Sequence, residues 1–364
     1  MRILHTEAST GWGGQEIRIL TEAAGMIARG HSVELACPAN ARIHAEAPRY
    51  GIRVHALPIG RKNPTGLLAM RGFLRAATCD VVNTHSSTDT WLTALASRGW
   101  KAPPLVRTRH ISAPVPDNRA TRWLYRRASA HVVTTGEALR EQLIRHNGLA
   151  AAHVTSVPTG IDPLRFPPTD SATRAARRRE LGLPRCGSLV GIVATLRSWK
   201  GHRYLLDAIA ALPDLDLHLA IVGDGPQRAA LEAQAQTLGV AGRVTFAGNR
   251  TDVSPWLQSF DLFALPSYAN EGVPQALLQA MFTALPAITT NAGAISEIAI
   301  HGETAHVVAR EDATALAHAL RALIADPSRA ADLGTAARTL VVERHSLAHM
   351  LDRMETVFQA VLRT

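Results

Sequence analysis

The chain has 364 residues, of which 46% are hydrophobic and 19% charged, and its formal net charge is +9. This length suits two domains, and the composition excludes a disordered chain. Aromatic residues make up only 5% of the sequence, which disfavours a stacking platform for single-stranded nucleic acid. The positive charge indicates an anionic partner, such as a phosphorylated small molecule or an acidic lipid surface; no motif supports nucleic acid.

Cysteine usage and the hydropathy pattern bear on location. Cys37, Cys79 and Cys186 are scattered and form no Cys-x-x-Cys pair, which favours a reducing compartment and disfavours a structural zinc site. Met1 and Arg2 lead directly into an apolar segment, so no signal peptide is expected. No apolar run approaches the roughly 18 residues needed to span a bilayer. The sequence therefore predicts a cytoplasmic protein.

Short apolar runs alternate with helix-length segments through the first half of the chain. Strands are predicted at 2–5, 33–37, 53–57, 80–83, 105–107, 131–135 and 154–157. Helices are predicted from 14 to about 28 and near 41–49, 65–77, 89–98, 119–128 and 136–146. This alternation predicts a parallel sheet with helices on both faces.

A glycine loop follows the first predicted strand. Gly13 and Gly14 end the segment Gly-Trp-Gly-Gly and precede a helix whose predicted apolar face is Ile17, Leu20, Ala24 and Ile27. A strand, a glycine loop and a helix together can bring backbone N–H groups close to a phosphate. No Gly-x-Gly-x-x-Gly fingerprint follows, so a dinucleotide site is not indicated.

Two of the predicted strands are followed by a histidine. His85 and His110 come just past the carboxyl ends of their strands, where side chains can face a ligand crevice. Ser112-Ala113-Pro114 predicts a loop that holds His110, and the alternative to a ligand contact for His110 is a surface or capping histidine. His85 is equally consistent with a contact to an acceptor substrate or with a structural role. Arg109 is a candidate for the same acceptor-side contact, and no role is assigned to His5.

The turn-rich stretch 167–171 predicts a linker. The expected domains are 1–168 and 169–345, followed by a terminal helix at 346–364. A basic helix follows the linker and is predicted to be a solvated linker helix; its arginines are Arg174, Arg177, Arg178 and Arg179.

The second half repeats the strand and helix alternation. Strands are predicted at 189–194, 217–222, 243–247, 261–265 and 286–289, with a short last strand after 304. Helices are predicted near 204–211, 226–238, 252–257, 274–281, 312–324, 329–342 and 346–362. The last of these has a regular apolar stripe, which indicates core packing.

Two cations follow the buried strand 189–194. Arg197 and Lys200 lie just before the helix near 204, and a pair of cations there suits two phosphates. The alternative for Lys200 is an ordinary surface lysine at a helix start.

The stretch from Glu271 to Met281 joins two apolar strands through a loop and a helix. Pro274 suits the first helical position, and ligands bind at this edge of α/β sheets. Eight positions separate Glu271 from Gln279, which is ~12 Å on a helix. This exceeds the ~5 Å of a retaining hydrolase pair and suits opposite ends of one long ligand. The alternative is a solvated loop glutamate and a surface glutamine.

This stretch resembles the donor-site signature of retaining GT-B glycosyltransferases of family 4, which is Glu-Gly-x-Pro followed by Glu-Ala-Met. Gln279 stands where the family has its second glutamate. Lys200-Gly201 matches the end of the family's Gly-Arg-x-x-x-x-Lys-Gly diphosphate segment, where Thr195 replaces the arginine and Arg197 is the candidate substitute. The resemblance covers nearly the whole chain.

The resemblance implies two Rossmann-like, doubly wound α/β domains facing a cleft, with the terminal helix crossing back to the first domain. It implies that Glu271 faces the donor sugar, that Gln279 holds the ribose and that His110 positions the sugar. The implied catalytic residues are His110, Lys200 and Glu271. The further implied donor-binding residues are Gly13, Gly14, Arg197, Gly225, Asn249, Gly272, Val273 and Gln279.

The implied reaction moves a sugar from a nucleotide diphosphate sugar to a lipid-linked, lipopolysaccharide or exopolysaccharide glycan, with retention of configuration and without metal or cofactor. Alternatives are a nucleotide-sugar epimerase of similar architecture and a scaffold protein with a degenerate donor site.

A peripheral contact with an anionic membrane is a further expectation. The predicted element is the helix near 65–77, with basic residues Arg61, Lys62, Arg71 and Arg75 and with Leu67, Leu68, Met70, Phe73 and Leu74 as apolar surface. The alternative is that these apolar residues pack on the sheet.

Overall fold

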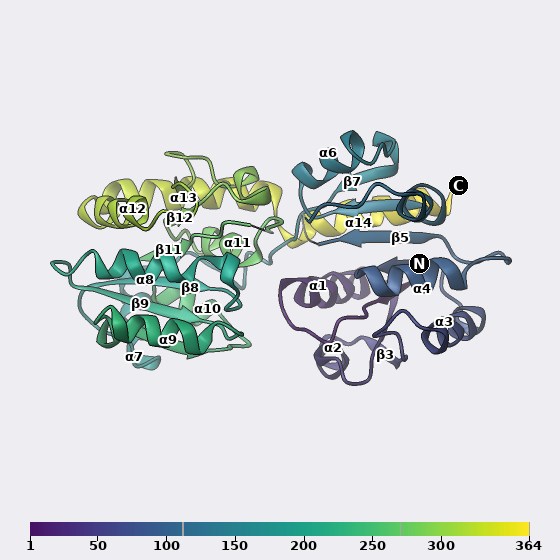
Figure 1. Cartoon of the computed structure of the whole chain (residues 1–364), viewed down its shortest axis with the longest axis horizontal. Helices are drawn as coiled ribbons and strands as arrows, with labels where there is room; N and C mark the ends of the chain where they lie inside the picture. Colours follow the sequence, from purple (N-terminus) through teal and green to yellow (C-terminus); the bar gives the residue numbers. More distant parts are fainter. Residues whose placement is uncertain (111–112, 270, 364) are drawn as a thin grey trace. The chain divides into compact units, whose positions relative to one another are not determined.

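The computed structural model describes residues 1–110, 113–269 and 271–363. The chain forms two compact units, one of Met1–Gly160 with Leu347–Thr364 and the other of Ile161–Ser346 (Figure 1). Each unit is built on one parallel sheet, so the predicted α/β class is confirmed. The chain leaves the first unit at Gly160, and the stretch 167–171 that was predicted as a linker lies within the second unit.

The first unit contains a seven-stranded sheet with the order β3-β2-β1-β4-β5-β6-β7. Its strands are β1 (Arg2–Thr6), β2 (Ser32–Cys37), β3 (Arg53–Ala56), β4 (Val81–Thr84), β5 (Leu105–Arg109), β6 (His131–Thr134) and β7 (Val154–Ser156). All neighbouring strands pair in parallel. The strand order reverses between β1 and β4, which is the position where sheets of this kind bind ligands.

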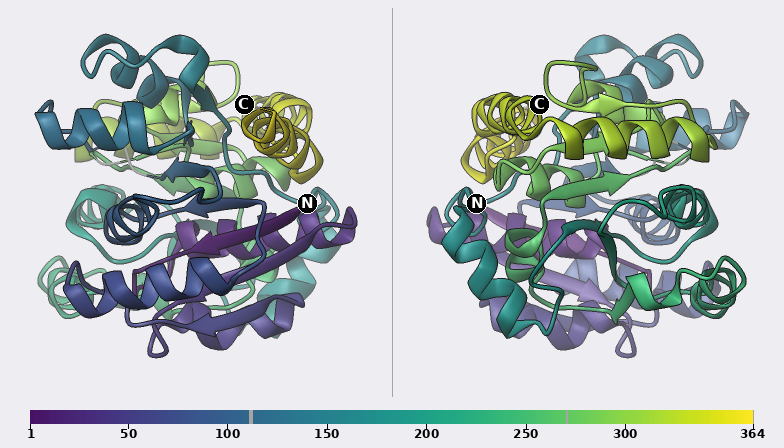
Figure 2. Two further views of the ribbon diagram at one scale, coloured as in Figure 1. Left: turned by 90° about the vertical axis from the view of Figure 1, so that its right-hand side faces the viewer. Right: turned by 90° about the vertical axis from the view of Figure 1, so that its left-hand side faces the viewer.

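Helices cover both faces of this sheet (Figure 2). They are α1 (Gly14–Ala28), α2 (Arg42–Glu46), α3 (Pro64–Ala76), α4 (Ser87–Ala96), α5 (Arg119–Trp123), α6 (Glu137–Arg145) and α14 (Leu347–Leu362). Side chains of successive strand residues point to opposite faces. Accordingly, Val81 packs in the cluster of α1 and α14, and Val82 packs in the cluster of α3 and α4.

The terminal helix α14 belongs to the first unit, as the resemblance implies (Figure 1). Met350, Met354 and Phe358 share a buried cluster with Ile19 of α1. A Cβ added to Gly25 would lie 2.5 Å from a side-chain carbon of Leu351. The absence of a side chain at Gly25 therefore lets α1 and α14 approach each other closely.

The predicted apolar face of α1 is only partly right. Of the four residues predicted on that face, Leu20 is buried, and Ile17, Ala24 and Ile27 are half-buried. The other buried residues of the helix are Glu16, Arg18, Ile19, Glu22, Ala23 and Met26. Arg18 and Glu22 are paired with each other, which is why a charged position can lie on the inner face.

The second unit contains a six-stranded sheet with the order β10-β9-β8-β11-β12-β13. Its strands are β8 (Ser188–Val193), β9 (Leu217–Val222), β10 (Val244–Gly248), β11 (Leu262–Leu265), β12 (Ala287–Thr289) and β13 (His306–Val307). Its helices are α7 (Ser171–Glu180), α8 (His202–Ala210), α9 (Arg228–Thr237), α10 (Ser254–Ser259), α11 (Gln275–Phe282), α12 (Ala313–Ala325) and α13 (Pro327–Arg344). One buried cluster extends through the unit.

The basic helix α7 is not the solvated linker helix that its charges suggest. Arg178 is only 6% exposed and donates to the carbonyl oxygens of Ser259 (2.9 Å) and Gly187 (3.2 Å). It also pairs with Asp261 at the start of β11. These charge-assisted hydrogen bonds attach α7 to the second unit.

Most of the apolar surface predicted for α3 is not available. Met70 and Leu74 are buried in the core, and Phe73 lies against the His55 ring. The Arg71 guanidinium donates to the carbonyl oxygen of Ala96 over 2.7 Å, so it is committed to α4. Leu68, at 69% exposure, remains the large exposed apolar residue of the helix.

A buried carboxyl group supports the glycine loop before α1. Glu7 follows β1 and is fully buried; its side chain accepts hydrogen bonds from the backbone N–H of Ser9 (2.7 Å) and from the Gln15 amide. Burial, together with the nearby Asp89 carboxyl, raises the pKa of Glu7 from 4.5 to about 8. The loop is thus held by a group that is protonated at neutral pH.

This pKa predicts a pH-dependent effect of Glu7→Gln on stability. Because the folded-state pKa lies above the ordinary one, the stabilisation from the protonated group is present at low pH and is lost as pH rises through about 8. The glutamine cannot ionise, so the Tm of the variant should gain on that of the wild type between pH 5 and 9. Thermal unfolding across this range measures the difference, with the exposed Glu303→Gln as control. Parallel pH curves for wild type and Glu7→Gln would contradict the assignment.

Candidate active site

In the second unit, loops from different strands meet at the carboxyl edge of the sheet. Gly201, after β8, has a φ of +76°, and a Cβ there would lie 2.0 Å from the carbonyl oxygen of Pro266 after β11. Gly293, after β12, has a φ of +57°, and a Cβ there would lie 2.0 Å from the carbonyl oxygen of Glu271. Only glycine permits both approaches, so these two positions hold the Glu271 loop between its neighbours.

Lys200 and Glu271 form the central pair of this site. The Lys200 Nζ lies 2.6 Å from Glu271 Oε1, and the Ser267 hydroxyl donates to the same oxygen over 2.6 Å. The Glu271 side chain is 6% exposed and that of Lys200 is 20% exposed. The carboxylate is therefore fixed from within the unit, and the ammonium group keeps N–H donors for an anionic ligand.

Lys200 lies two residues before the first residue of α8, and Gly201 is the N-cap of that helix. A helix N-terminus offers unpaired N–H groups to a phosphate. Arg197 begins the 3-10 turn Ser198–Lys200; its guanidinium is exposed and lies 5.7 Å from the centre of the Trp199 ring. Thr195, which replaces the family arginine, is also exposed.

The other predicted donor-binding residues of this unit differ in what they can offer. The Val273 side chain is buried in the core, so only the backbone of Val273 could contact a ligand. Gly272, directly before it, has no side chain and could likewise contribute only backbone groups. Gln279 is half-buried on α11. The Gly225 N–H donates to Asp224 Oδ1 over 2.7 Å, and Asn249 is exposed just after β10.

The sequence analysis missed two polar residues of this region. Ser267 supports Glu271, and its position just past the end of β11 was the signal that could have identified it. His202 is 2% exposed, and neither of its ring nitrogens has a hydrogen-bond partner among the described residues. Burial, together with the Lys200 charge, lowers the pKa of His202 to about 3.

In the first unit, the glycine loop lies where the sequence predicts it. Gly13 is the N-cap of α1 and Gly14 is the first residue of the helix. Both remain candidates for a phosphate contact at a helix N-terminus.

Three histidines in the first unit form a hydrogen-bonded chain. His5 Nδ1 lies 2.8 Å from His85 Nε2, and His85 Nδ1 lies 2.9 Å from His110 Nε2. The rings come from the three adjacent strands β1, β4 and β5 or the residue after them. Burial lowers the pKa of all three, and the Arg18 charge adds to the effect. All three rings are therefore neutral at pH 7.

The hydrogen bonds of His85 bear on its two alternative roles. His85 is 3% exposed, and both its ring nitrogens are engaged by histidines, which favours the structural role. His110 is half-buried and is the histidine of the chain that keeps some exposure. Ser112, in the loop predicted after it, lies outside the described residues.

Arg109, predicted on the acceptor side, forms hydrogen bonds with Tyr125 and with the segment that follows its own strand. Its guanidinium donates to the Tyr125 hydroxyl over 3.3 Å and to the carbonyl oxygen of Ala113. Arg107, which the sequence analysis did not single out, donates to the same hydroxyl over 3.0 Å and to the carbonyl oxygen of Ser86 over 3.0 Å. The period of a strand puts both arginines on one face.

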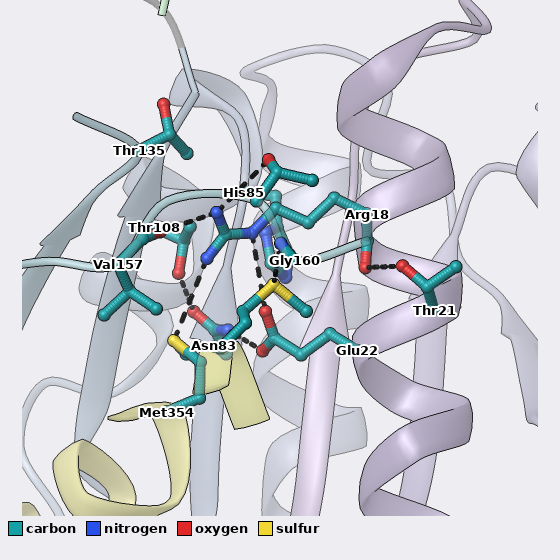
Figure 3. Close-up of polar contacts among 12 residues, drawn as sticks. Arg18, Thr21, Glu22, Asn83, His85, Thr108, Thr135, Val157, Gly160 and Met354 are labelled. Atoms are coloured by element: carbon teal, nitrogen blue, oxygen red, sulfur yellow. Dashed lines mark hydrogen bonds and ion pairs between the residues drawn. The ribbon is translucent and has the colours of Figure 1, made fainter. Parts of the chain in front are cut away.

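A buried charged cluster lies beside these histidines (Figure 3). Arg18 Nε is 3.6 Å from Glu22 Oε2, and Arg18 also donates to the carbonyl oxygen of Val157 over 2.7 Å. The Asn83 amide donates to Glu22 over 3.3 Å and accepts from Thr108 over 2.8 Å. Arg18 is therefore a fixed positive charge under the carboxyl ends of the strands.

Across residues 1–110, 113–269 and 271–363, no group of three or more His, Cys, Asp or Glu side chains is arranged to hold a metal ion. In the histidine chain, the ring nitrogens face one another in successive pairs and do not converge on one point. Among the same residues, no helix combines the length and apolar character needed to cross a bilayer.

Comparison with known proteins places this geometry in a family. Residues 12–165 match the model of Glycosyltransferase Family 4, and residues 187–326 match that of Glycosyl transferases group 1. A D-inositol 3-phosphate glycosyltransferase of Xylanimonas cellulosilytica is 30% identical, over 90% of this chain and 87% of its own length. The lipopolysaccharide core biosynthesis mannosyltransferase LpsB of Rhizobium meliloti is 28% identical, over 71% and 74%.

Among solved structures, Anabaena Alr3699/HepE in complex with UDP and glucose matches with a TM-score of 0.87. The sequence identity is 23%, and the match covers 99% of each chain. The family models, the relatives and the shared fold show that this chain is a glycosyltransferase of family 4, the group 1 glycosyl transferases, with the GT-B fold.

Proposed function

We propose that this glycosyltransferase uses a nucleoside diphosphate sugar, with UDP as the first nucleotide to test, and transfers the sugar to a glycan acceptor with retention of anomeric configuration. The observation that carries the proposal is the Lys200–Glu271 pair at the N-terminus of α8. Support for UDP comes from the Anabaena protein, which was solved with UDP and glucose. Support for a lipopolysaccharide or lipid-linked glycan comes from the Rhizobium relative.

Lys200 and Arg197 are assigned to the diphosphate. When the bond between the anomeric carbon and the phosphate oxygen breaks, negative charge develops on the leaving diphosphate, and preorganised donors stabilise it. Lys200 keeps N–H groups for this purpose after its contact with Glu271, and the N-terminus of α8 adds backbone N–H groups. Two protein cations at the diphosphate agree with a reaction that needs no metal.

Glu271 and His110 are assigned to the donor sugar, with the backbone of Gly272 and Val273 beside Glu271. Glu271 Oε1 already accepts hydrogen bonds from Lys200 and Ser267, and this makes that oxygen a poor nucleophile. Retention without a protein nucleophile is supported by this arrangement. In the proposed step, the acceptor hydroxyl oxygen bonds to the anomeric carbon as the phosphate leaves, and a departing phosphate oxygen takes the hydroxyl proton.

Gln279 is assigned to the ribose, and Gly225 and Asn249 to the nucleotide. The glutamine side chain both donates and accepts, so it can bind hydroxyl groups without carrying a charge. A scaffold protein with a degenerate donor site remains an outcome of the tests below, because Thr195 and Gln279 depart from the family pattern.

Peripheral attachment to an anionic membrane is proposed for the first unit, with a smaller contact than the sequence indicates. The residues that remain exposed for it are Arg61, Lys62, Leu68 and Arg75. Each basic residue near an anionic leaflet contributes about 1 kcal/mol, so three of them support reversible attachment.

Nucleotide binding tests the donor assignment. UDP at 100 times its Kd should stabilise the wild type by ~2.7 kcal/mol, which a thermal-shift panel with UDP, GDP and ADP will detect. Lys200→Ala should lose most of this shift and lower turnover roughly 10²–10³-fold. The exposed Lys101→Ala is the matched control. A folded Lys200→Ala variant with normal binding and turnover would remove the diphosphate assignment.

Two substitutions test the ribose assignment. Gln279→Ala should weaken UDP binding by ~0.5–1.5 kcal/mol, the contribution of one neutral hydrogen bond. Gln279→Glu should bind UDP at least as well as the wild type, because it restores the family residue. Calorimetric titration compares both with the exposed Gln236→Ala. Normal UDP binding by Gln279→Ala would show that the residue does not contact the nucleotide.

Liposome sedimentation tests the membrane contact. The wild type should sediment with vesicles containing anionic lipid and stay in solution with neutral vesicles, because the attraction is electrostatic. A variant with Arg61, Lys62 and Arg75 changed to Gln should lose this binding. The control changes three exposed arginines elsewhere, Arg179, Arg185 and Arg344, to Gln and removes the same charge. Equal loss in both variants would refute a specific contact.

A further inference from the structure

The histidine chain has two ends with different surroundings. At one end, His5 is fully buried, and its Nε2 has no hydrogen-bond partner among the described residues. At the other end, His110 keeps some exposure, and its Nε2 is engaged by His85. Nδ1 of His110 is therefore the nitrogen through which the chain can meet a ligand.

The hydrogen bonds of the histidine chain couple the tautomer of His5 to the tautomer of His110. A neutral imidazole carries one N–H and one lone pair. If His5 donates through Nδ1, His85 accepts at Nε2 and must donate through its own Nδ1, and His110 then accepts at Nε2 and carries its proton on Nδ1. In the reverse direction, every proton lies on Nε2, and His110 presents a lone pair at Nδ1. The tautomer of His110 is thus tied to that of His5.

The surroundings of His5 favour the first direction. The reverse direction would leave a buried Nε2–H without an acceptor, whereas the first leaves only a lone pair without a donor. An orphaned buried N–H is the less tolerated of the two.

We propose that His5 is a positioning residue that acts through His85 to hold His110 in the Nδ1–H tautomer, so that His110 presents a hydrogen-bond donor to the sugar of the nucleotide donor. The chemical consequence is that His110 donates a hydrogen bond from Nδ1–H, and an oxygen atom of the sugar accepts it. The part that concerns the sugar rests on the proposed function, and the tautomer itself does not.

Nitrogen NMR of the free protein tests the tautomer directly. In protein labelled with ¹⁵N-histidine, long-range proton–nitrogen spectra distinguish Nδ1–H from Nε2–H rings, and each of the 16 histidines can be assigned by the variant that lacks it. The expected result is Nδ1–H for His5, His85 and His110. An Nε2–H form of His110 in the wild type would overturn the proposal, without any need for substrate.

Two substitutions of equal size test the coupling. His5→Asn keeps an N–H donor beside His85, so both other rings should stay Nδ1–H. The ionised carboxylate of His5→Asp offers only acceptors, so both rings should change to Nε2–H above the pKa of that carboxyl group, which a pH series of the spectra locates. If His5→Asp does not fold, the wild-type spectrum and His5→Asn decide alone. His131→Asn is the matched control, because His131 does not belong to the histidine chain and forms its own hydrogen bond with Thr155 over 2.9 Å. Unchanged tautomers in a folded His5→Asp variant would contradict the coupling.

Ligand binding separates this inference from the proposed function. His5→Asp should weaken binding of the UDP-sugar on the order of tenfold and leave binding of UDP unchanged, whereas a general loss of structure would weaken both. His5→Asn should bind both as the wild type does. Equal weakening of UDP and UDP-sugar would overturn the positioning role. The expected tautomers in a protein that binds no nucleotide would refute only the proposed donor.

Discussion

The parallel direction of every strand is the constraint on which both units depend. Parallel strands place all their carboxyl ends on one edge, so the loops that follow them gather there. In the second unit, this edge brings Lys200, after β8, to Glu271, after β11, although 71 positions separate them. In the first unit, it brings His5, His85 and His110 into one chain from three neighbouring strands. Both groups of residues are products of the same topology.

Buried charge is distributed unequally between the two groups. In the first unit, Arg18 and Glu22 lie fully inside, and burial lowers the pKa of Arg18 and raises that of Glu22. A buried pair of this kind contributes little net stability, and removing one partner is strongly destabilising. Burial keeps the nearby histidines neutral, and the Arg18 charge adds to this effect. In the second unit, the Lys200 ammonium group is partly open to solvent and can meet a ligand.

The departures from the family pattern, Thr195 and Gln279, both fall on positions that the resemblance assigns to the nucleotide, whereas the Lys200–Glu271 pair is intact. Thr195 and Gln279 each remove a charge relative to the family signature. A hydrogen bond from a neutral group is weaker than one from an ion, so the proposed nucleotide site depends more on Lys200, Arg197 and the N-terminus of α8. The altered residues would therefore affect affinity for the nucleotide more than the chemistry at the sugar.

The sequence by itself determined the order and type of the elements. Periodicity and turn residues are local signals, and the strands and most helices lie within a few residues of their predicted ranges. The signature from Glu271 to Met281 also identified the family, because a loop and helix that bind a ligand require particular residues at a fixed spacing. The roles of Glu271, Lys200, His110 and Gln279 remain predictions from that signature.

Only the tertiary structure decided which polar residues are buried and what they contact. Sequence periodicity treats Arg18, Glu22 and Arg178 as surface charges, yet each is buried. Besides the local pair of Arg18 with Glu22, their partners Val157, Asn83 and Asp261 come from elsewhere in the fold. The same applies to His5 and His85, whose hydrogen bonds join residues 80 positions apart. A charge or a ring is stable inside a protein only when a partner satisfies it, and no local pattern encodes a partner on another strand.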